Sequence, residues 1–391
     1  MQQGIFNILP MDRVVYGTPA AQAVAGEVER LGASSVFLIV SETLATSTDE
    51  IDRVRAALGN RVAGTFSGVP PHVPRAAVIE AAAQARAAGA DLICTIGGGS
   101  VTDAGKGVQI CLAHGITEAA GLDALHIRPQ PDGSLHNPLI ARGGPIVRQI
   151  AVPTTLSGGE FNSTGGMTDL ATHRKHAYAH PLITPRAVIL DPAICRHTPE
   201  WLWLSTGIRA FDHTVEALCS KAPSAYTDGT ALHAMSLLMA GLTACKQDGA
   251  DLEARLTALQ GVWLSIAAVQ AGIPMGASHA MGRALGGSCG VPHGHTSCVL
   301  LPAVMRWNRA VNAAQQARVA AAMGRPGEEA ADVIEAFIAG LGQPVRLSQV
   351  GIGPEKFELI AEASMADRGI RSNPRPIDGP AEVRQILELA A

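Results

Sequence analysis

The chain has 391 residues, of which 47% are hydrophobic and 16% are charged, so it is long enough for two domains with sizeable cores. Its formal net charge is −4 and no block of Lys and Arg stands out, which excludes a nucleic-acid surface built on a basic stripe. The N-terminal sequence MQQGIFNILP lacks the pattern of a signal peptide, and no window holds the roughly 18 apolar residues of a membrane span. We therefore expect a cytoplasmic protein that binds neither nucleic acid nor membrane.

The first half of the chain alternates short β-branched runs with Ala-rich stretches of helical periodicity. A strand, a helix and a second strand at this spacing predict a parallel sheet wound with helices. The expected elements are, in chain order, a strand at 34–41, a helix at 74–89, a strand at 91–99, a helix at 101–115, and strands at 148–155 and 186–192.

Two further regions differ from this pattern. Residues 122–147 are rich in Pro and Gly and predict a loop or excursion. After about residue 195 strand signals stop, and helical periodicity takes over. The expected helices are 200–221, 227–246, 251–271 and 312–324. We expect two domains, an α/β domain over 1–195 and an all-helical domain over 196–391.

A glycine run, Gly97-Gly98-Gly99-Ser100, lies between a predicted strand and a predicted helix. Glycines let a phosphate approach the backbone, and the free N–H groups of a helix start favour its negative charge. Ser100 is placed to cap the helix, with Asp103 three residues on. The alternative is a tight turn without a ligand. Walker A and Rossmann fingerprints both fail, because position 107 is Gly and position 102 is Thr.

The second half carries histidines that could converge. Arg209, His213 and Glu216 share one helical face, and His279 and His293 follow in a later segment. Three histidines with an open position would suit a first-row metal ion, although isolated histidines usually have structural roles.

The glycine run belongs to a longer stretch, GGGSVTDAGK (97–106), that resembles the GGGSxxDxxK element of the iron-type (group III) alcohol dehydrogenases. RVVYG (13–17), PTTLSGGE (153–160), Lys175 and Asp191-Pro192 are similar to other motifs of that superfamily, in its order and spacing. The resemblance implies a dehydroquinate synthase-like fold, with an α/β dinucleotide-binding domain followed by an all-α domain. It also implies NAD or NADP as the cofactor, and commonly a homodimer.

The same resemblance implies which residues bind the cofactor. They are Gly97, Gly98, Gly99, Ser100 and Asp103 at the pyrophosphate, Thr154 and Thr155 near the nicotinamide ribose, Lys175, and Glu42 at the adenosine ribose. A carboxylate at Glu42 would favour NAD over NADP, because it repels a 2′-phosphate; an ordinary exposed acid is the alternative. The segment between Thr155 and Glu160 is one residue shorter than in general members, which resembles the maleylacetate reductases.

Members of the superfamily bind iron or zinc through one Asp and three His. His213, His279 and His293 fall on the three His positions, but the Asp position is Arg209 and a further family His is Arg283. A guanidinium cannot ligate a cation and repels one. Asp212 is a poor substitute, since it lies about 100° around the helix from His213. Maleylacetate reductases also lack this Asp.

We therefore favour metal-free chemistry in which Arg209 orients a substrate carboxylate or stabilises the alkoxide that develops as hydride arrives, and His213, His279 or His293 donates the proton. The two arginines, Arg209 and Arg283, fit an anionic substrate. An interior salt bridge of Arg209 with Glu216 or Asp212 is the structural alternative. The expected enzyme transfers hydride from NAD(P)H to a small carbonyl substrate, such as a keto acid. A metal-dependent alcohol or polyol dehydrogenase, a dehydroquinate synthase-like lyase and a non-catalytic nucleotide-binding relative remain alternatives.

Overall fold

The computed structural model describes residues 6, 8–130, 134–172 and 174–391 of the chain. These residues form two compact units, Ile8–His197 and Thr198–Ala391.

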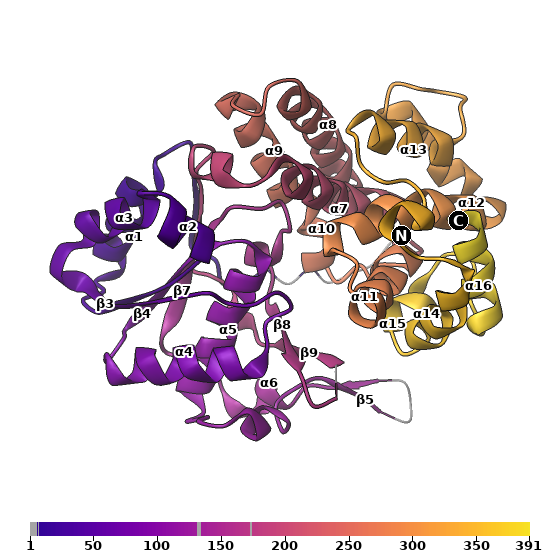
Figure 1. The fold of residues 1–391 in the computed structure, drawn as a ribbon. Helices are drawn as coiled ribbons and strands as arrows, with labels where there is room; N and C mark the ends of the chain where they lie inside the picture. Colours follow the sequence, from indigo (N-terminus) through magenta and orange to yellow (C-terminus); the bar gives the residue numbers. More distant parts are fainter. Residues whose placement is uncertain (1–5, 7, 131–133, 173) are drawn as a thin grey trace. The chain divides into compact units, whose positions relative to one another are not determined.

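Ile8–His197 is built on a six-stranded parallel sheet of strand order β1-β10-β7-β4-β2-β3 (Figure 1). The strands are β1 (Arg13–Tyr16), β2 (Val36–Val40), β3 (Val62–Ser67), β4 (Leu92–Gly97), β7 (Arg148–Pro153) and β10 (Ala187–Leu190). Every residue of β2, β4 and β10 is buried, as expected for a parallel sheet covered on both faces. The predicted α/β class is confirmed, and β3 is a strand that the sequence reading did not identify.

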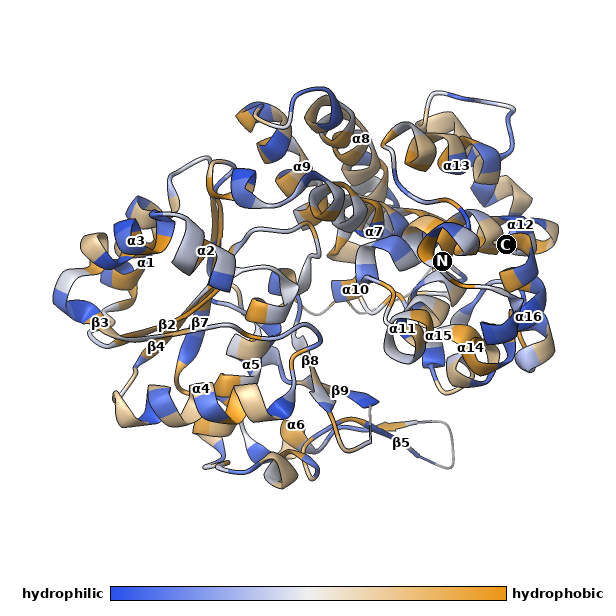
Figure 2. Cartoon of the chain, viewed as in Figure 1, coloured by the Kyte–Doolittle hydropathy of each residue, from blue (hydrophilic) through white to orange (hydrophobic). Residues whose placement is uncertain are grey.

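Helices cover both faces of this sheet. On one face α1 (Ala20–Leu31) packs on α3 (Glu50–Leu58), and on the other α4 (Arg75–Ala87) packs on α5 (Gly99–Ala113). The short helix α2 (Glu42–Ser47) follows β2. In Figure 2 orange and blue residues alternate along α1, α3 and α4, which is the pattern of helices with one apolar face on a core.

The excursion at 122–147 contains short elements of its own. They are the hairpin of β5 (Arg128–Pro129) and β6 (Leu135–His136), and the helix α6 (Pro138–Arg142), which Asn137 caps through Leu139 N. A longer hairpin, β8 (Thr164–Asp169) with β9 (Arg174–Ala179), packs against α5. The sequence reading missed this hairpin because β8, TGGMTD, has two glycines and no β-branched run.

Thr198–Ala391 is helical, and the structure shows no strand among its residues, in agreement with the predicted all-α class. Its helices are α7 (Glu200–Leu218), α8 (Ala225–Gln247), α9 (Leu252–Ser265), α10 (Ala267–Gln270), α11 (Ala277–Cys289), α12 (His293–Ala322), α13 (Ala330–Gly340), α14 (Phe357–Ser364), α15 (Arg368–Ser372) and α16 (Pro380–Leu389). A core of buried side chains from α11, α12, α14 and α16 stabilises one part of it. In the described part of the chain, every helix is too short or too polar to cross a bilayer.

Two helix predictions need correction. Residues 312–324 were expected as a separate helix, but they continue α12 through a break at Asn312, whose φ of −137° is not helical. The segment 251–271 is two helices, because α9 ends at Ser265 and α10 begins at Ala267.

Candidate active site

The glycine run lies at the carboxyl edge of the sheet, where β4 ends. Gly97 is the last residue of β4, Gly98 precedes the helix, and α5 begins at Gly99. A Cβ atom on Gly98 would lie 3.1 Å from Thr155, so this turn touches the segment that follows β7. The N–H of Thr154 donates to the carbonyl oxygen of Gly97 at 3.0 Å. The structure thus brings the predicted glycine run and the predicted Thr pair together.

Glu42 lies near the same edge, directly after β2, the neighbour of β4 in the sheet. Its side chain is exposed, and it is the first residue of α2. The carboxyl edge of a parallel sheet is the usual place for a dinucleotide, with the pyrophosphate at a helix start.

The predicted capping role of Ser100 is wrong. The residue before α5 is Gly98, and Ser100 lies inside the first turn, where its side chain does not cap the helix. Asp103 bonds elsewhere: its Oδ2 accepts the N–H of Gly166 at 3.2 Å and pairs with Lys175 Nζ at 3.5 Å. Asp103 and Lys175 therefore connect α5 to the β8–β9 hairpin.

Lys106 is a residue whose role the sequence did not indicate. Its side chain is fully buried, and its Nζ donates to the carbonyl oxygens of Gly159 (2.6 Å), Asn162 (2.9 Å) and Thr164 (2.8 Å) and to Asn162 Oδ1 (2.9 Å). Burial lowers the pKa of Lys106 to about 8. The ammonium group thus holds the chain between β7 and β8 against α5.

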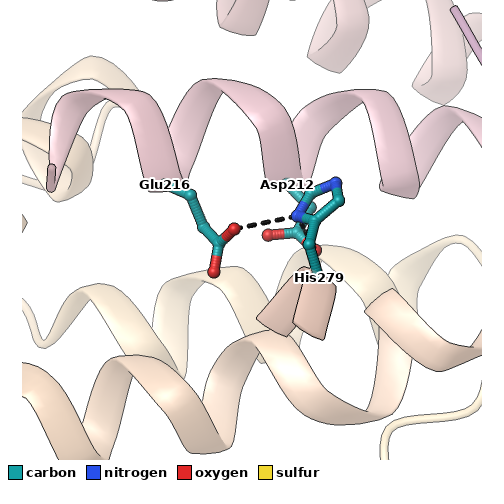
Figure 3. Close-up of side chains that lie close together, drawn as sticks. All are labelled: Asp212, Glu216 and His279. Carbon is teal, nitrogen blue, oxygen red and sulfur yellow. Dashed lines mark hydrogen bonds and ion pairs between the residues drawn. The ribbon is translucent and has the colours of Figure 1, made fainter. Parts of the chain in front are cut away.

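A second cluster of polar side chains lies inside the helical unit, between α7 and α11 (Figure 3). Asp212 and Glu216 project from α7, and His279 projects from α11 toward both. The Nδ1 atom of His279 lies 2.9 Å from Glu216 Oε2 and 3.4 Å from Asp212 Oδ2. Ser278 Oγ donates to Asp212 Oδ2 at 2.7 Å. The ligand-type atoms of these two acids and the histidine all lie within 4.8 Å of one another.

Glu216 also fixes the start of α11. Its carboxylate accepts the backbone N–H groups of Gly276 (2.8 Å) and Ser278 (2.9 Å), two of the donors that a helix leaves unsatisfied at its first turn. Burial raises the pKa of Glu216 to about 7, against the lowering effect of these two hydrogen bonds. Burial and the neighbouring Glu216 raise the pKa of Asp212 well above its usual range.

The histidines of the sequence prediction are only partly brought together. The rings of His213 and His279 stack at 4.6 Å with an interplanar angle of 20°. Burial, together with the charges of Arg209 and Arg283, holds the pKa of both histidines well below 6.5. His293 is the first residue of α12 and its side chain is exposed. Among the described residues, the cluster suited to a metal ion includes neither His213 nor His293.

The two arginines have different surroundings. Arg283 forms a two-pronged ion pair with Asp367 (Nε–Oδ2 2.5 Å, Nη2–Oδ1 2.7 Å), and its side chain is 44% exposed. Arg209 is 8% exposed, and its hydrogen bond to a described residue is a long one to Ser297 Oγ at 3.4 Å. No described carboxylate lies within 4.0 Å of its guanidinium nitrogen atoms. The salt bridge to Glu216 or Asp212 considered above is therefore not formed.

Comparisons with known proteins agree with this architecture. Residues 11–192 match the family model "Iron-containing alcohol dehydrogenase", and residues 203–391 match the model "Fe-containing alcohol dehydrogenase family, C-terminal". A dehydrogenase of Alternaria alternata is 35% identical over 370 residues, which cover 86% of this chain and 94% of the relative. A maleylacetate reductase of Burkholderia cepacia is 31% identical, with 97% of this chain and 95% of the relative covered.

The fold agrees with solved structures as well. The crystal structure of maleylacetate reductase from Rhizobium sp. strain MTP-10005 has a TM-score of 0.82 and 28% sequence identity, with 100% of this chain and 98% of that chain covered. The two family models together span nearly the whole chain, one on each unit. The chain therefore belongs to the iron-containing alcohol dehydrogenase family, as a dehydrogenase or reductase near the maleylacetate reductases.

Proposed function

We propose that this enzyme transfers hydride from NAD(P)H to the carbonyl carbon of a small substrate that carries a carboxylate, and that it does so without a metal ion. The observation that carries the proposal is Arg209, a buried guanidinium with no carboxylate of a described residue within 4.0 Å of its nitrogen atoms. A buried charge is unfavourable unless it is paired. A substrate carboxylate would provide that pair, through two parallel N–H···O bonds.

Arg283 is less available than Arg209 to bind a substrate carboxylate, because it is paired with Asp367. From the sequence, both arginines fitted an anionic substrate. In the structure, however, both carboxylate oxygens of Asp367 already accept hydrogen bonds from Arg283. We therefore assign substrate binding to Arg209, with Arg283 contributing positive potential: burial, and in addition the charge of Arg283, lower the pKa of Arg209, His213 and His279. The maleylacetate reductases among the relatives act, by their name, on a keto acid of this class.

The donor atoms of the cluster do not fit a resident metal ion. Glu216 already accepts the backbone N–H groups of Gly276 and Ser278, and it shares a third hydrogen bond with Nδ1 of His279. The Nδ1 atom of His279, which lies nearest to Asp212 and Glu216, is engaged in one of these hydrogen bonds. Arg209 adds a positive charge that repels a cation. We propose that Arg209 takes over the electrostatic role of the metal and stabilises the alkoxide that forms as hydride arrives.

The carboxyl edge of the sheet supports the cofactor assignment. A Cβ atom would lie 3.1 Å from Thr155 at Gly98 and 2.9 Å from Ser157 Oγ at Gly99, so glycine suits this tight turn. The free N–H groups at the start of α5 suit a pyrophosphate. We propose NAD as the preferred form, because the exposed carboxylate of Glu42 follows β2 where an adenosine ribose would lie.

The test is the oxidation of NADH and NADPH by the purified enzyme with maleylacetate, and with uncharged aldehydes and ketones, before and after chelation. We expect turnover of the keto acid that chelation leaves unchanged, and a preference for NADH. Turnover that chelation abolishes and added Fe²⁺ or Zn²⁺ restores would refute the metal-free proposal. It would favour a metal-dependent alcohol dehydrogenase, for which the close approach of Asp212, Glu216 and His279 is the supporting observation.

A further inference from the structure

The excursion at 122–147 contains a cavity that the proposed function does not use. Its volume is about 540 Å³, and it is bounded by the chain at 120–124, by the hairpin of β5 and β6, and by α6 (β5 and α6 in Figure 1). Pockets of this size hold small organic ligands. Its described lining includes four ionisable side chains, Asp123, Arg128, His136 and Arg142, and we call it the excursion basin.

The basic side chains of the excursion basin come from adjacent elements. Arg128 of β5 is directly opposite His136 of β6 in the antiparallel register, so both side chains leave the same face of the hairpin. Arg142 is the last residue of α6. Asn137, which caps α6, also fixes this helix beside β9, because its Nδ2 donates to the carbonyl oxygen of Ala179 at 2.9 Å. Three basic groups therefore line one basin.

Hydrogen bonds hold Arg128 in place. Its Nη2 donates to the carbonyl oxygen of Asp123, and its Nε lies 3.4 Å from Nε2 of His126. The Nδ1 atom of His126 lies 3.0 Å from the carbonyl oxygen of Ile127. Because a carbonyl only accepts, Nδ1 carries the ring proton and Nε2 accepts from Arg128. These bonds engage Nε and Nη2 of the guanidinium group, which leaves Nη1 for a ligand.

A buried layer supports His126 in turn. Its ring stacks on that of His176 in β9, with the ring centroids 4.1 Å apart and an interplanar angle of 9°. Nδ1 of His176 lies 2.6 Å from Nη2 of Arg75, and since a guanidinium only donates, this nitrogen accepts. Arg75 belongs to α4 and is 4% exposed. Arg128 is therefore positioned before a ligand arrives, which lowers the entropic cost of binding.

The excursion basin has an excess of positive charge. Asp123 is the one carboxylate among the described residues that line it. Nη1 of Arg75 lies 2.5 Å from this carboxylate and 3.8 Å from Asp169, which does not line the basin. Arg142 is exposed and makes no hydrogen bond or ion pair with a residue that the structure describes. Because Arg75 offsets Asp123, the charges of Arg128 and Arg142 remain to attract an anion.

We propose that the excursion basin is a second ligand site, which binds a small dianion through Arg128, His136 and Arg142. The ligand carries its two negative charges on phosphate or carboxylate oxygens, because guanidinium groups bind both by paired N–H···O bonds. The ring of His136 supplies one further N–H donor even when it is neutral. This site is independent of the function proposed above, since its residues belong to Ile8–His197 and Arg209 belongs to Thr198–Ala391.

The test is isothermal titration calorimetry at low ionic strength, with inorganic phosphate and, separately, with succinate. We expect wild type to bind, and the double variant Arg128→Gln/Arg142→Gln to bind about tenfold more weakly or less, because hydrogen bonds to charged groups are lost. Binding of either probe at this site supports the proposal. The ratio of the two affinities shows whether the natural ligand is a phosphorylated compound or a dicarboxylate.

The matched control is Arg53→Gln/Arg55→Gln on α3, which removes the same amount of charge from exposed arginines that pair with Asp49 and Asp52 in the same unit. The control variant and Arg209→Met should both bind phosphate as wild type does. An unchanged affinity in the basin variant, an equal loss in the control variant, or a loss in Arg209→Met would overturn the proposal. So would a wild-type protein that binds neither probe with a Kd below about 10 mM.

A second measurement needs no variant and covers the case in which the double variant does not fold. Phenylglyoxal modifies accessible arginines of wild-type protein, and mass spectrometry reports the extent at each position. We expect phosphate to protect Arg142 and to leave the modification of the exposed Arg53 unchanged. Equal modification of Arg142 with and without phosphate would contradict the proposal.

Discussion

Replacement of Arg209 by methionine should make the protein more stable and nearly inactive. Burial lowers the pKa of Arg209 from 12.5 to about 10, which corresponds to roughly 3 kcal/mol by which the fold disfavours the charged guanidinium. The unfolded chain does not carry this penalty, so the charge destabilises the native state at neutral pH. Methionine keeps the apolar length of the side chain and removes the charge. We expect the free energy of unfolding to rise by about 1–3 kcal/mol.

The Arg209→Met variant should no longer be stabilised against unfolding by an anionic ligand. A ligand that binds only the native state stabilises wild type by about 2.7 kcal/mol at 100 times its Kd. Urea unfolding is measured for both proteins, with and without a saturating dicarboxylate, and kcat/KM is measured for the keto acid. We expect the ligand to stabilise wild type alone, and kcat/KM to fall by roughly 100-fold or more when the buried charge is lost.

Arg283→Met is the matched control, because Arg283 is paired where Arg209 is not. Its removal leaves Asp367 without its partner, and since the pair is partly exposed the stability should fall by about 1 kcal/mol. The two substitutions should therefore change stability in opposite directions. A loss of stability in Arg209→Met as large as that in Arg283→Met would show that Arg209 is already paired in the native protein, and would refute the reasoning.

Three further predictions concern other buried groups. Lys106→Met should lower the free energy of unfolding by more than about 3 kcal/mol in urea denaturation, because three carbonyl oxygens and an amide oxygen lose their charged donor; a loss below about 1 kcal/mol would contradict this. Burial raises the pKa of Glu160 from 4.5 to about 7, so between these pH values Glu160 is protonated in the native state and ionised in the unfolded chain. The contribution of this group to the free energy of unfolding therefore falls as pH rises through the same interval. Glu160→Gln should accordingly match wild type near pH 4.5 and exceed it by about 2–3 kcal/mol at pH 8, and a gain that does not vary with pH would speak against the assignment. Of the seven thiols, only the half-buried Cys289 should react with a disulfide reagent in native protein, and rapid reaction of a second thiol would be inconsistent with the structure.

The parallel sheet could be predicted because its strands are continuous apolar runs. VFLIV in β2 and LICTIG in β4 are buried at every position, and such runs are characteristic of strands covered on both faces. The β8 strand, with its two glycines, carries no such signal, and its position depends on contacts with α5 that a local pattern does not contain. Ser100 was misassigned for a related reason: Gly98 already has the extended conformation that precedes a helix, so α5 begins one residue before Ser100.

The sequence could predict most residues of the site in the helical unit, but it could not predict how their side chains contact one another. Periodicity placed Arg209, His213 and Glu216 on one face of a helix, and separated Asp212 from His213. It could not show that a second helix, α11, brings His279 against Asp212 and Glu216. Nor could it show that Asp367, which lies 84 residues after Arg283, pairs with that arginine. These contacts depend on tertiary packing, and they determine which arginine is left for a ligand.

The bonding of Lys106 has a consequence for how the enzyme responds to salt. Its ammonium group is enclosed by main-chain carbonyl groups, and the nearby Lys175 pairs with Asp103. A dinucleotide at the start of α5 would then meet backbone dipoles rather than a free side-chain cation, and the dipoles of this half-buried turn are screened less than fully exposed charges. NADH titrations between low and high ionic strength should give nearly constant dissociation constants. A cell could therefore change its salt content widely without changing how much of this enzyme carries its coenzyme.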